Sequence, residues 1–273
     1  MKRVLALHDL CVFSKSSLSV VIPVMEALGV ECGAVPTAIL STQTDGFPSL
    51  ESLDLTDDIP RFYTKVKSWG YSFDAVYSGY LASSHQAGIV RDIMTEEKDA
   101  LRFVDPVLGD GGELYSTFGQ SDVDGMKSLI RHADVITPNI TEAVILTGSE
   151  KKESYTNHDL EELMEKLLSF GPDRVVITSV PLANGLLANA AHEKGSMRIF
   201  SYEDLGFSLP GCGDLFASLT LGLMMRGGNF FSSVHTAGLM ATDAVKWAIR
   251  HGRERRLGVS LIPVMDEIKR RVI

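Results

Sequence analysis

The stretch "RVLALHDLCVFSKSSLSVVIPVMEALGVECGAVPTAIL", residues 3–40, decides the fold class. Residues 3–8 form a short apolar run that is typical of a buried strand, and residues 31–40 form a second one. Between them, residues 16–29 carry apolar side chains at helical spacing and end at Gly29, as helices commonly do. Strand, helix and strand in this order predict a β-then-α repeat.

The same alternation continues through the rest of the chain. Further strands are expected at residues 73–81, 101–107, 134–139 and 173–180, with helices at 57–69, 83–97, 121–133, 141–148 and 157–171. Residues 185–193 and 196–203 predict a hairpin, and helices end the chain. We therefore predict an α/β fold with a doubly wound, mainly parallel sheet and helices on both faces. No linker-like segment interrupts the pattern, which indicates one domain over residues 1–273.

The composition excludes several classes of protein. Hydrophobic residues make up 45% of the 273 residues, which is enough for a sizeable core. The net charge is −9 and there is no basic block, which argues against a nucleic-acid or membrane partner. No run approaches the ~20 apolar residues of a membrane helix. The 3 cysteines form no C-x-x-C pair, so a cytoplasmic protein is predicted.

Well-known nucleotide and hydrolase motifs are missing from the sequence. It contains no G-x-x-x-x-G-K-[ST], no G-x-G-x-x-G, no H-E-x-x-H and no G-x-S-x-G. In a doubly wound sheet, ligands bind beyond the carboxyl ends of the strands. Polar and glycine residues that follow the expected strands are therefore the candidates for a site.

The loop "GCGD", Gly211 to Asp214, opens an apolar run that is predicted to be helical. A glycine-rich turn at a helix start presents free N–H groups at the positive end of the helix dipole. These N–H groups would hold an anion while Asp214 takes a proton from a substrate hydroxyl. The alternative is a structural turn in which Asp214 only caps the helix. Taken alone, the loop leaves both interpretations open.

Three further loops carry candidate residues. In "TPNITEA", Asn139 and Glu142 lie three apart on one face of a helix start, where they suit a hydrated magnesium ion, a phosphate or ordinary capping. Asp105 ends a strand, and "GDGGELY" after it predicts either a glycine-rich flap or a plain surface loop. Thr178 and Ser179 end another strand. Together with the "GCGD" loop, these parts are the ones that phosphoryl transfer requires.

From "LALHD" to the helix after Gly211, the sequence resembles the pyridoxal kinase group of the ribokinase superfamily. The most specific signs are "DPVLGD", "TPNITEAVILTG" and "GCGDLFASL" in that order, and "PTAILSTQTDGF" and "YSGYL" also fit. The resemblance implies a ribokinase-like fold. It also implies transfer of the γ-phosphate of ATP to the 5′-hydroxymethyl group of a B6 vitamer, with Mg²⁺ and often a monovalent cation such as K⁺.

The resemblance also implies residue roles. Asp214 matches the catalytic base, and its loop matches the anion hole. The matched residues are Gly211, Cys212 and Gly213 for the anion hole; Asp105, Asn139 and Glu142 for phosphate and metal; Tyr115, Thr137, Thr178 and Ser179 for the nucleotide; and Asp9, Thr44 and Tyr80 for the pyridine ring. Members of the group usually form cytoplasmic homodimers.

The sequence departs from the group at two positions. Many relatives have serine in place of Asp9 and threonine in place of Cys212. A thiol at a helix N-terminus has a lowered pKa, so Cys212 is either reactive toward the aldehyde of pyridoxal or, as we favour, a plain replacement. Hydroxymethylpyrimidine kinases of thiamine synthesis often carry cysteine in place of Asp214, so this aspartate favours a B6 kinase. A nucleotide-binding module with little catalysis is the other alternative, and Asp214 and the N-x-x-E motif argue against it.

Overall fold

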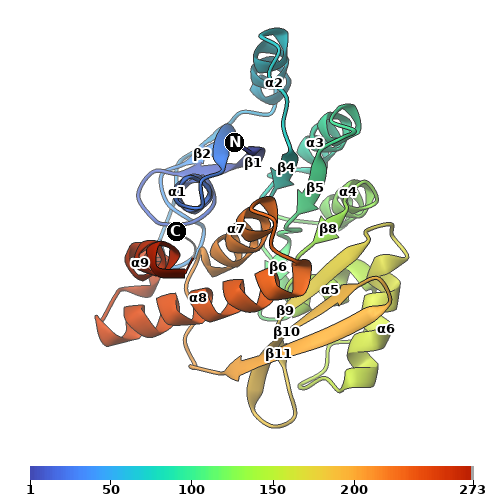
Figure 1. Ribbon diagram of the computed structural model, residues 1–273, viewed down its shortest axis with the longest axis vertical. Helices are drawn as coiled ribbons and strands as arrows, with labels where there is room; N and C mark the ends of the chain where they lie inside the picture. Colours follow the sequence, from blue (N-terminus) through green and yellow to red (C-terminus); the bar gives the residue numbers. More distant parts are fainter. Residues whose placement is uncertain (272–273) are drawn as a thin grey trace. The chain divides into compact units, whose positions relative to one another are not determined.

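A computed structural model describes residues 1–271 of the chain. It separates into two compact units, one made of Met1–Ala75 with Leu205–Ile273 and the other of Val76–Asp204. Figure 1 labels the helices and strands along the sequence. The prediction of a single domain over residues 1–273 stays a prediction.

The first unit contains the β-α-β arrangement expected from residues 3–40. Strand β1 pairs with β2 in parallel, and the short β3 pairs with β2 in the antiparallel direction. Helix α1 packs on both long strands through its buried apolar side chains, and α7 packs against α1 and α8. The elements are β1 (Arg3–Cys11), α1 (Leu18–Ala27), β2 (Glu31–Leu40), β3 (Ser52–Asp54), α2 (Asp58–Ser68), α7 (Cys212–Met225), α8 (Phe230–Arg250), the 3₁₀ turn η1 (Arg255–Leu257) and α9 (Ile262–Arg271).

The second unit continues the alternation of strands and helices. Its strands follow the order β11-β10-β9-β8-β5-β4, in which β5, β8 and β9 are parallel neighbours and β9, β10 and β11 are antiparallel neighbours. Helices α5 and α6 pack on β9. The elements are β4 (Ala75–Ser78), α3 (Ser84–Glu96), β5 (Leu101–Val104), β6 (Gly109–Asp110), β7 (Glu113–Leu114), α4 (Gln120–Ile130), β8 (Val135–Ile136), α5 (Ile140–Thr147), α6 (Asn157–Leu168), β9 (Arg174–Pro181), β10 (Leu186–Glu193) and β11 (Ser196–Glu203).

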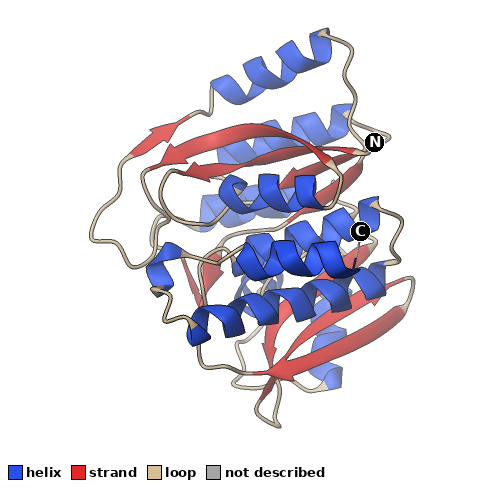
Figure 2. Cartoon of the chain, turned by 60° about the vertical axis from the view of Figure 1, so that its left-hand side comes forward, coloured by secondary structure: helices blue, strands red, loops and turns tan. Residues whose placement is uncertain are grey.

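The predicted α/β fold with a mainly parallel, helix-covered sheet is confirmed, and Figure 2 shows the strands in red and the helices in blue. One difference bears on the site. Strand β1 runs to Cys11, beyond the expected end at His8, so Asp9 lies inside the strand. The pairing of β1 with β2 is irregular between His8 and Leu10, and such bulges often re-aim a side chain beside a functional site. Within residues 1–271, no helix combines the length and apolar character needed to cross a membrane.

Candidate active site

The turn before α7 is shaped by close contact with the segment that follows β1. Gly211 has a φ of +84°, in the left-handed region that favours glycine. A Cβ atom on Gly211 would lie 2.3 Å from the carbonyl oxygen of Lys15, a distance that no side chain tolerates. The N–H of Cys212 donates to the carbonyl of Leu209 at 3.2 Å. The anion hole expected at Gly211, Cys212 and Gly213 stays a prediction.

Asp214 lies in the first turn of α7, and its two carboxylate oxygens have different surroundings. Oδ2 accepts a hydrogen bond from the N–H of Ser17 at 2.9 Å, whereas Oδ1 lies 3.9 Å from Nδ1 of His8. Burial raises the pKa of Asp214 to about 6, the nearby charge of Asp9 adds to the rise, and the Ser17 bond opposes it. A base with a pKa this close to neutrality suits proton removal from an alcohol at physiological pH.

Asp9 is a second buried carboxylate in this part of the first unit. It is 3% exposed, and burial raises its pKa. Its carboxylate accepts a hydrogen bond from the thiol of Cys11 at 3.4 Å, and the polar side chain of Ser17 opposes the rise of its pKa. Burial lowers the pKa of His8 to about 3, so this imidazole is neutral at physiological pH and brings no positive charge to either carboxylate.

The structure argues against a reactive Cys212, the less favoured of the two interpretations. Burial raises the pKa of its thiol to about 12, and the charge of Asp214 adds to the rise, so the helix N-terminus does not produce a thiolate here. The thiol is protonated at physiological pH and is a poor nucleophile. This agrees with the interpretation of Cys212 as a plain replacement.

Thr44 is exposed, on the loop after β2. The neighbouring residue ties this loop to the segment before α1, because the N–H of Gln43 donates to the hydroxyl of Ser14 at 2.8 Å. The structure thus places Thr44 in the same unit as Asp9 and Asp214. Its contact with the pyridine ring stays a prediction.

In the second unit, the N-x-x-E motif forms the first turn of α5. Asn139 caps the helix, accepting from the N–H of Glu142 at 2.9 Å, and Glu142 accepts from the N–H of Asn139 at 2.8 Å. The second oxygen of Glu142 accepts from the N–H of Leu108 at 3.0 Å. The hydroxyl of Thr137 donates to Asp105 at 3.0 Å. Burial and the charge of Asp105 raise the pKa of Glu142 well above its usual range.

The glycine-rich segment after Asp105 is anchored to the same helix start. Residues 109–114 form the β6–β7 hairpin, and the carbonyl of Gly109 accepts from the side-chain amide of Asn139 at 2.9 Å. The N–H of Gly112 donates to the hydroxyl of Thr141 at 2.9 Å. The root of the expected flap is therefore tied to the N-x-x-E turn, and closure of the segment over a nucleotide stays a prediction.

The remaining candidates of the second unit form two groups. Asn139 and Thr178 are bridged as parallel neighbours, and Ser179 beside them has a φ of +56°, a costly conformation for serine. Tyr80 and Tyr115 both contact the ring of Phe118, at centroid distances of 5.6 and 6.4 Å. Sequence reasoning missed Phe118, because a single aromatic residue in a loop carries no pattern. The expected roles of these residues stay predictions.

The carboxylates of the second unit show whether the predicted magnesium site suits a metal ion. Among residues 1–271, no group of three or more histidine, cysteine, aspartate or glutamate side chains is arranged to hold one. Asp105 and Glu142 are nevertheless buried close enough for their charges to interact. Protein-bound Mg²⁺ is commonly held by one or two carboxylates, several waters and substrate phosphates. The pair therefore fits a hydrated magnesium ion that arrives with a nucleotide.

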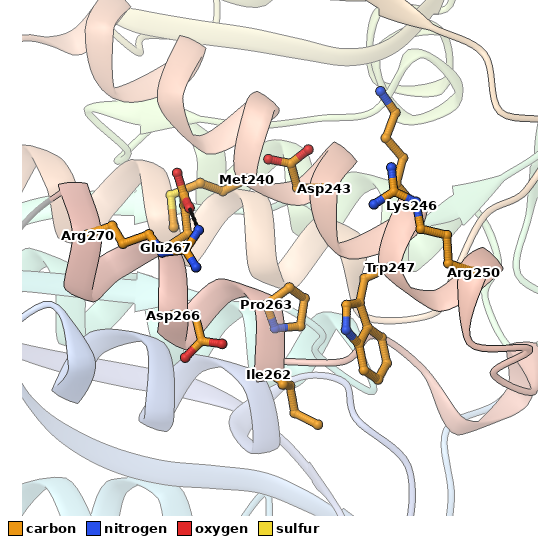
Figure 3. Close-up of a pocket in the computed structure, with 10 residues that line it drawn as sticks. All are labelled: Met240, Asp243, Lys246, Trp247, Arg250, Ile262, Pro263, Asp266, Glu267 and Arg270. Atoms are coloured by element: carbon orange, nitrogen blue, oxygen red, sulfur yellow. Dashed lines mark ion pairs between the residues drawn. The ribbon is translucent and has the colours of Figure 1, made fainter.

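A separate pocket of about 350 Å³ lies in the first unit between α8 and α9. Figure 3 shows its mixed lining, in which α8 contributes Asp243, Lys246 and Arg250 and α9 contributes Asp266. Glu267 and Arg270 form an ion pair at its edge, with 3.9 Å between their charged atoms. Its lining contains none of the candidate residues above, and we assign it no part in the site.

Comparison with known proteins then decides the family, since the family model for phosphomethylpyrimidine kinase matches residues 22–258. The chain belongs to this family. It is 30% identical to the pyridoxal kinase of Bos taurus over 220 residues, 72% of this chain and 69% of the bovine protein. Membership in this phosphomethylpyrimidine kinase family confirms that the protein is an enzyme that transfers phosphoryl groups.

Two solved structures extend the likeness to nearly the whole chain. A protein of Bacteroides thetaiotaomicron VPI-5482, named as a phosphomethylpyrimidine kinase and crystallised with pyridoxal, is 34% identical with a TM-score of 0.93, covering 98% of this chain and 96% of that one. Pyridoxal kinase from Lactobacillus plantarum is 31% identical with a TM-score of 0.91 and the same coverage. The predicted resemblance to the pyridoxal kinases and the ribokinase-like fold are confirmed.

Proposed function

We propose that the protein is an ATP-dependent kinase that phosphorylates the 5′-hydroxymethyl group of a B6 vitamer: pyridoxal, pyridoxamine or pyridoxine. The observation that carries the proposal is the buried carboxyl of Asp214, with a pKa near 6 and one oxygen fixed by the N–H of Ser17. The family match and the similarity to a protein crystallised with pyridoxal support it. The likeness to proteins named pyridoxal kinase supports it further.

The first unit activates the acceptor. A primary alcohol is a poor nucleophile, so its proton must leave as the oxygen attacks phosphorus. Asp214 takes this proton, and the N–H groups of Gly211 and Gly213 stabilise the transferring phosphoryl group. Asp9 and Thr44 contact the vitamer ring.

The second unit holds the nucleotide and its cation. The nucleotide contacts are Tyr115, Thr137, Asn139, Thr178 and Ser179, with Tyr80 against the vitamer ring. Asp105 and Glu142 hold Mg²⁺, which neutralises charge on the phosphates when it is bound. A monovalent cation such as K⁺ assists, and the working form is a cytoplasmic homodimer.

Phosphorylation of hydroxymethylpyrimidine is the second candidate, because the matching family model carries the name of a pyrimidine kinase. The aspartate at position 214, where the pyrimidine kinases often have cysteine, supports the B6 reaction. An ionisable carboxyl with a tuned pKa argues against a binding module without catalysis.

Turnover by the purified protein tests the proposal. We expect ATP-dependent phosphorylation of at least one of the three vitamers, with a kcat/KM above that for hydroxymethylpyrimidine measured in the same buffer. A higher kcat/KM for the pyrimidine would overturn the B6 assignment. Binding of ATP without turnover of any acceptor would favour the binding module.

A further inference from the structure

Phe118 contacts two tyrosines that the proposed function assigns to different substrates. Its ring centroid is 5.6 Å from that of Tyr80, with 31° between the ring planes, and 6.4 Å from that of Tyr115, with 51° between the planes. Both separations fall in the range of about 4.5–7 Å in which aromatic rings attract one another. Tyr80 is the expected contact of the vitamer ring and Tyr115 that of the nucleotide, so one phenylalanine touches a candidate residue of each substrate.

One carboxylate joins the chain segments that carry Tyr80 and Phe118. Asp122, in the first turn of α4, accepts from the N–H of Ser84 at 3.0 Å through Oδ1 and from the N–H of Gly119 at 3.0 Å through Oδ2. Ser84 begins α3 shortly after Tyr80, and Gly119 directly follows Phe118. The contact between Phe118 and Tyr80 is therefore built into the pairing of two helix starts.

The backbone around the three rings is held by packing and by hydrogen bonds. A Cβ atom on Gly125 of α4 would lie 2.8 Å from the Cα of Ser84, so α4 packs directly against the start of α3. The N–H of Phe118 donates to the carbonyl of Tyr115 at 2.9 Å, and the N–H of Tyr115 donates to that of Leu108 at 3.0 Å. With the backbone fixed in this way, the conformational freedom that remains is rotation of the side chains.

Rotation of these tyrosine rings has a cost for binding. A ring that turns freely must be ordered when a substrate arrives, and this ordering weakens the binding of the substrate. Tyr115 is 37% exposed and Tyr80 is partly buried, so neither ring is enclosed on all sides. Phe118, itself partly buried, packs against both rings and restricts their rotation before a substrate binds.

We propose that Phe118 is a positioning residue for both substrates of the kinase: its ring holds Tyr80 ready for the vitamer ring and Tyr115 ready for the nucleotide. The proposal rests on the proposed kinase function and adds a part to it. Phe118 acts through the two tyrosines and not on the reacting atoms. Loss of its ring should therefore weaken the binding of both substrates and leave the phosphoryl-transfer step nearly unchanged.

Two variants of Phe118 separate the ring from its apolar bulk. Phe118→Leu removes the ring and keeps an apolar side chain, whereas Phe118→Tyr keeps the ring. We expect Phe118→Leu to raise the KM for the vitamer and the KM for ATP by up to about tenfold each, the worth of one aromatic pair, and to keep kcat within about twofold. Phe118→Tyr should have KM values near those of the wild type. Unchanged KM values in Phe118→Leu, or equal increases in both variants, would overturn the proposal.

Phe170→Leu is the matched control. Phe170 is also partly buried in the second unit, and the guanidinium of Arg131 lies over its ring at 5.6 Å from the centroid. Its loss should leave both KM values at the wild-type level, while urea unfolding reports how much each leucine variant destabilises the fold. Increases in KM of equal size in Phe170→Leu and Phe118→Leu would attribute the effect to a loosened unit and overturn the proposal.

Double-mutant cycles test whether Phe118 acts through the tyrosines. Once Tyr80 is replaced by leucine, adding Phe118→Leu should raise the vitamer KM no further, and Tyr115→Leu should remove the effect of Phe118→Leu on the KM for ATP in the same way. A further increase as large as the one in the wild-type background would contradict the proposal.

Binding of pyridoxal in the absence of ATP, measured by equilibrium dialysis, gives a readout that is independent of turnover. Weaker binding by Phe118→Leu together with an inactive wild type would support the positioning role and overturn the kinase function. An active wild type that binds pyridoxal with the same dissociation constant as Phe118→Leu would support the kinase function and overturn the positioning role.

Discussion

Replacing Asp214 by asparagine keeps the shape of the side chain and removes its charge. Asparagine still presents an oxygen to the N–H of Ser17, so the first turn of α7 is preserved. The variant therefore distinguishes two effects of the buried carboxyl, which are its contribution to catalysis and its cost to the stability of the fold. We expect the variant to lose activity and to become more stable at neutral and basic pH.

The magnitude follows from the pKa of Asp214, which is about 6 in the folded protein against an ordinary value of 3.8. A difference of about 2 units corresponds to about 3 kcal/mol, and a side chain that is only 12% exposed is little screened by solvent. Because the folded state has the higher pKa, protonation favours folding: the contribution is present below pH 3.8 and is lost as the pH rises through 6. The ionised carboxylate therefore costs the folded state up to about 3 kcal/mol at pH 8.

Urea unfolding of both proteins at pH 4 and pH 8 measures this cost. The stability margin of Asp214→Asn over wild type should be larger at pH 8 than at pH 4 by about 2 kcal/mol. With saturating ATP and vitamer, kcat should fall by about 10²–10⁴, the usual worth of general-base catalysis. Dissociation constants for both ligands should stay within about tenfold of wild type, or about 1.4 kcal/mol.

Either half of this prediction can refute the reasoning. A stability margin that is equal at pH 4 and pH 8 would mean that Asp214 ionises normally and that its burial does not tune it. A variant that turns over near the wild-type rate would mean that Asp214 only caps α7. In that case the base would have to be sought elsewhere.

Three further predictions concern the neighbouring residues. Gly211→Ala should lower the free energy of unfolding by at least about 1–3 kcal/mol, because the added Cβ meets the Lys15 carbonyl. Gly252 also has a positive φ but has open space around it, so Gly252→Ala should lower the free energy of unfolding less. Equal losses of both variants in urea unfolding would contradict the close contact at Gly211. Cys212→Thr should change kcat/KM for pyridoxal and pyridoxine equally, because a thiol with a pKa of about 12 does not add to the aldehyde of pyridoxal. A loss of kcat/KM confined to pyridoxal would support a reactive thiol at position 212. Glu142→Gln should raise the magnesium concentration for half-maximal turnover while the vitamer KM changes little, because the substitution removes charge beside Asp105. A raised vitamer KM with an unchanged magnesium requirement would instead assign Glu142 to vitamer binding.

The long elements of the fold were predictable because their patterns are long. β1, α1 and β2 each span nine or ten mainly apolar residues, and the predicted hairpin of β10 and β11 lies within one residue of its observed ends. The short β3 and the β6–β7 pair were missed, since two or three residues show no periodicity. Their pairing is set by neighbours distant in sequence.

The residue types of the candidate site could be predicted from local sequence patterns, but the hydrogen bonds between distant residues could not. The Gly211 turn and the N-x-x-E turn stand out locally, since glycines and capping patterns act within a few residues. The link from Ser17 to Asp214 joins positions 197 apart in sequence, and nothing near either residue indicates it. The high pKa of Cys212 was also hidden, because the sequence shows the helix start and not the atoms that bury the thiol.

The identity of the phosphorylated product tests the central claim most directly. Purified protein is incubated with ATP, Mg²⁺ and pyridoxal, and the product is examined by phosphorus NMR, with Asp214→Asn as the matched control. The account predicts a phosphate ester coupled to the protons of the 5′-methylene group, formed by the wild type and nearly absent with Asp214→Asn. Release of inorganic phosphate from ATP with no ester on the vitamer would contradict it.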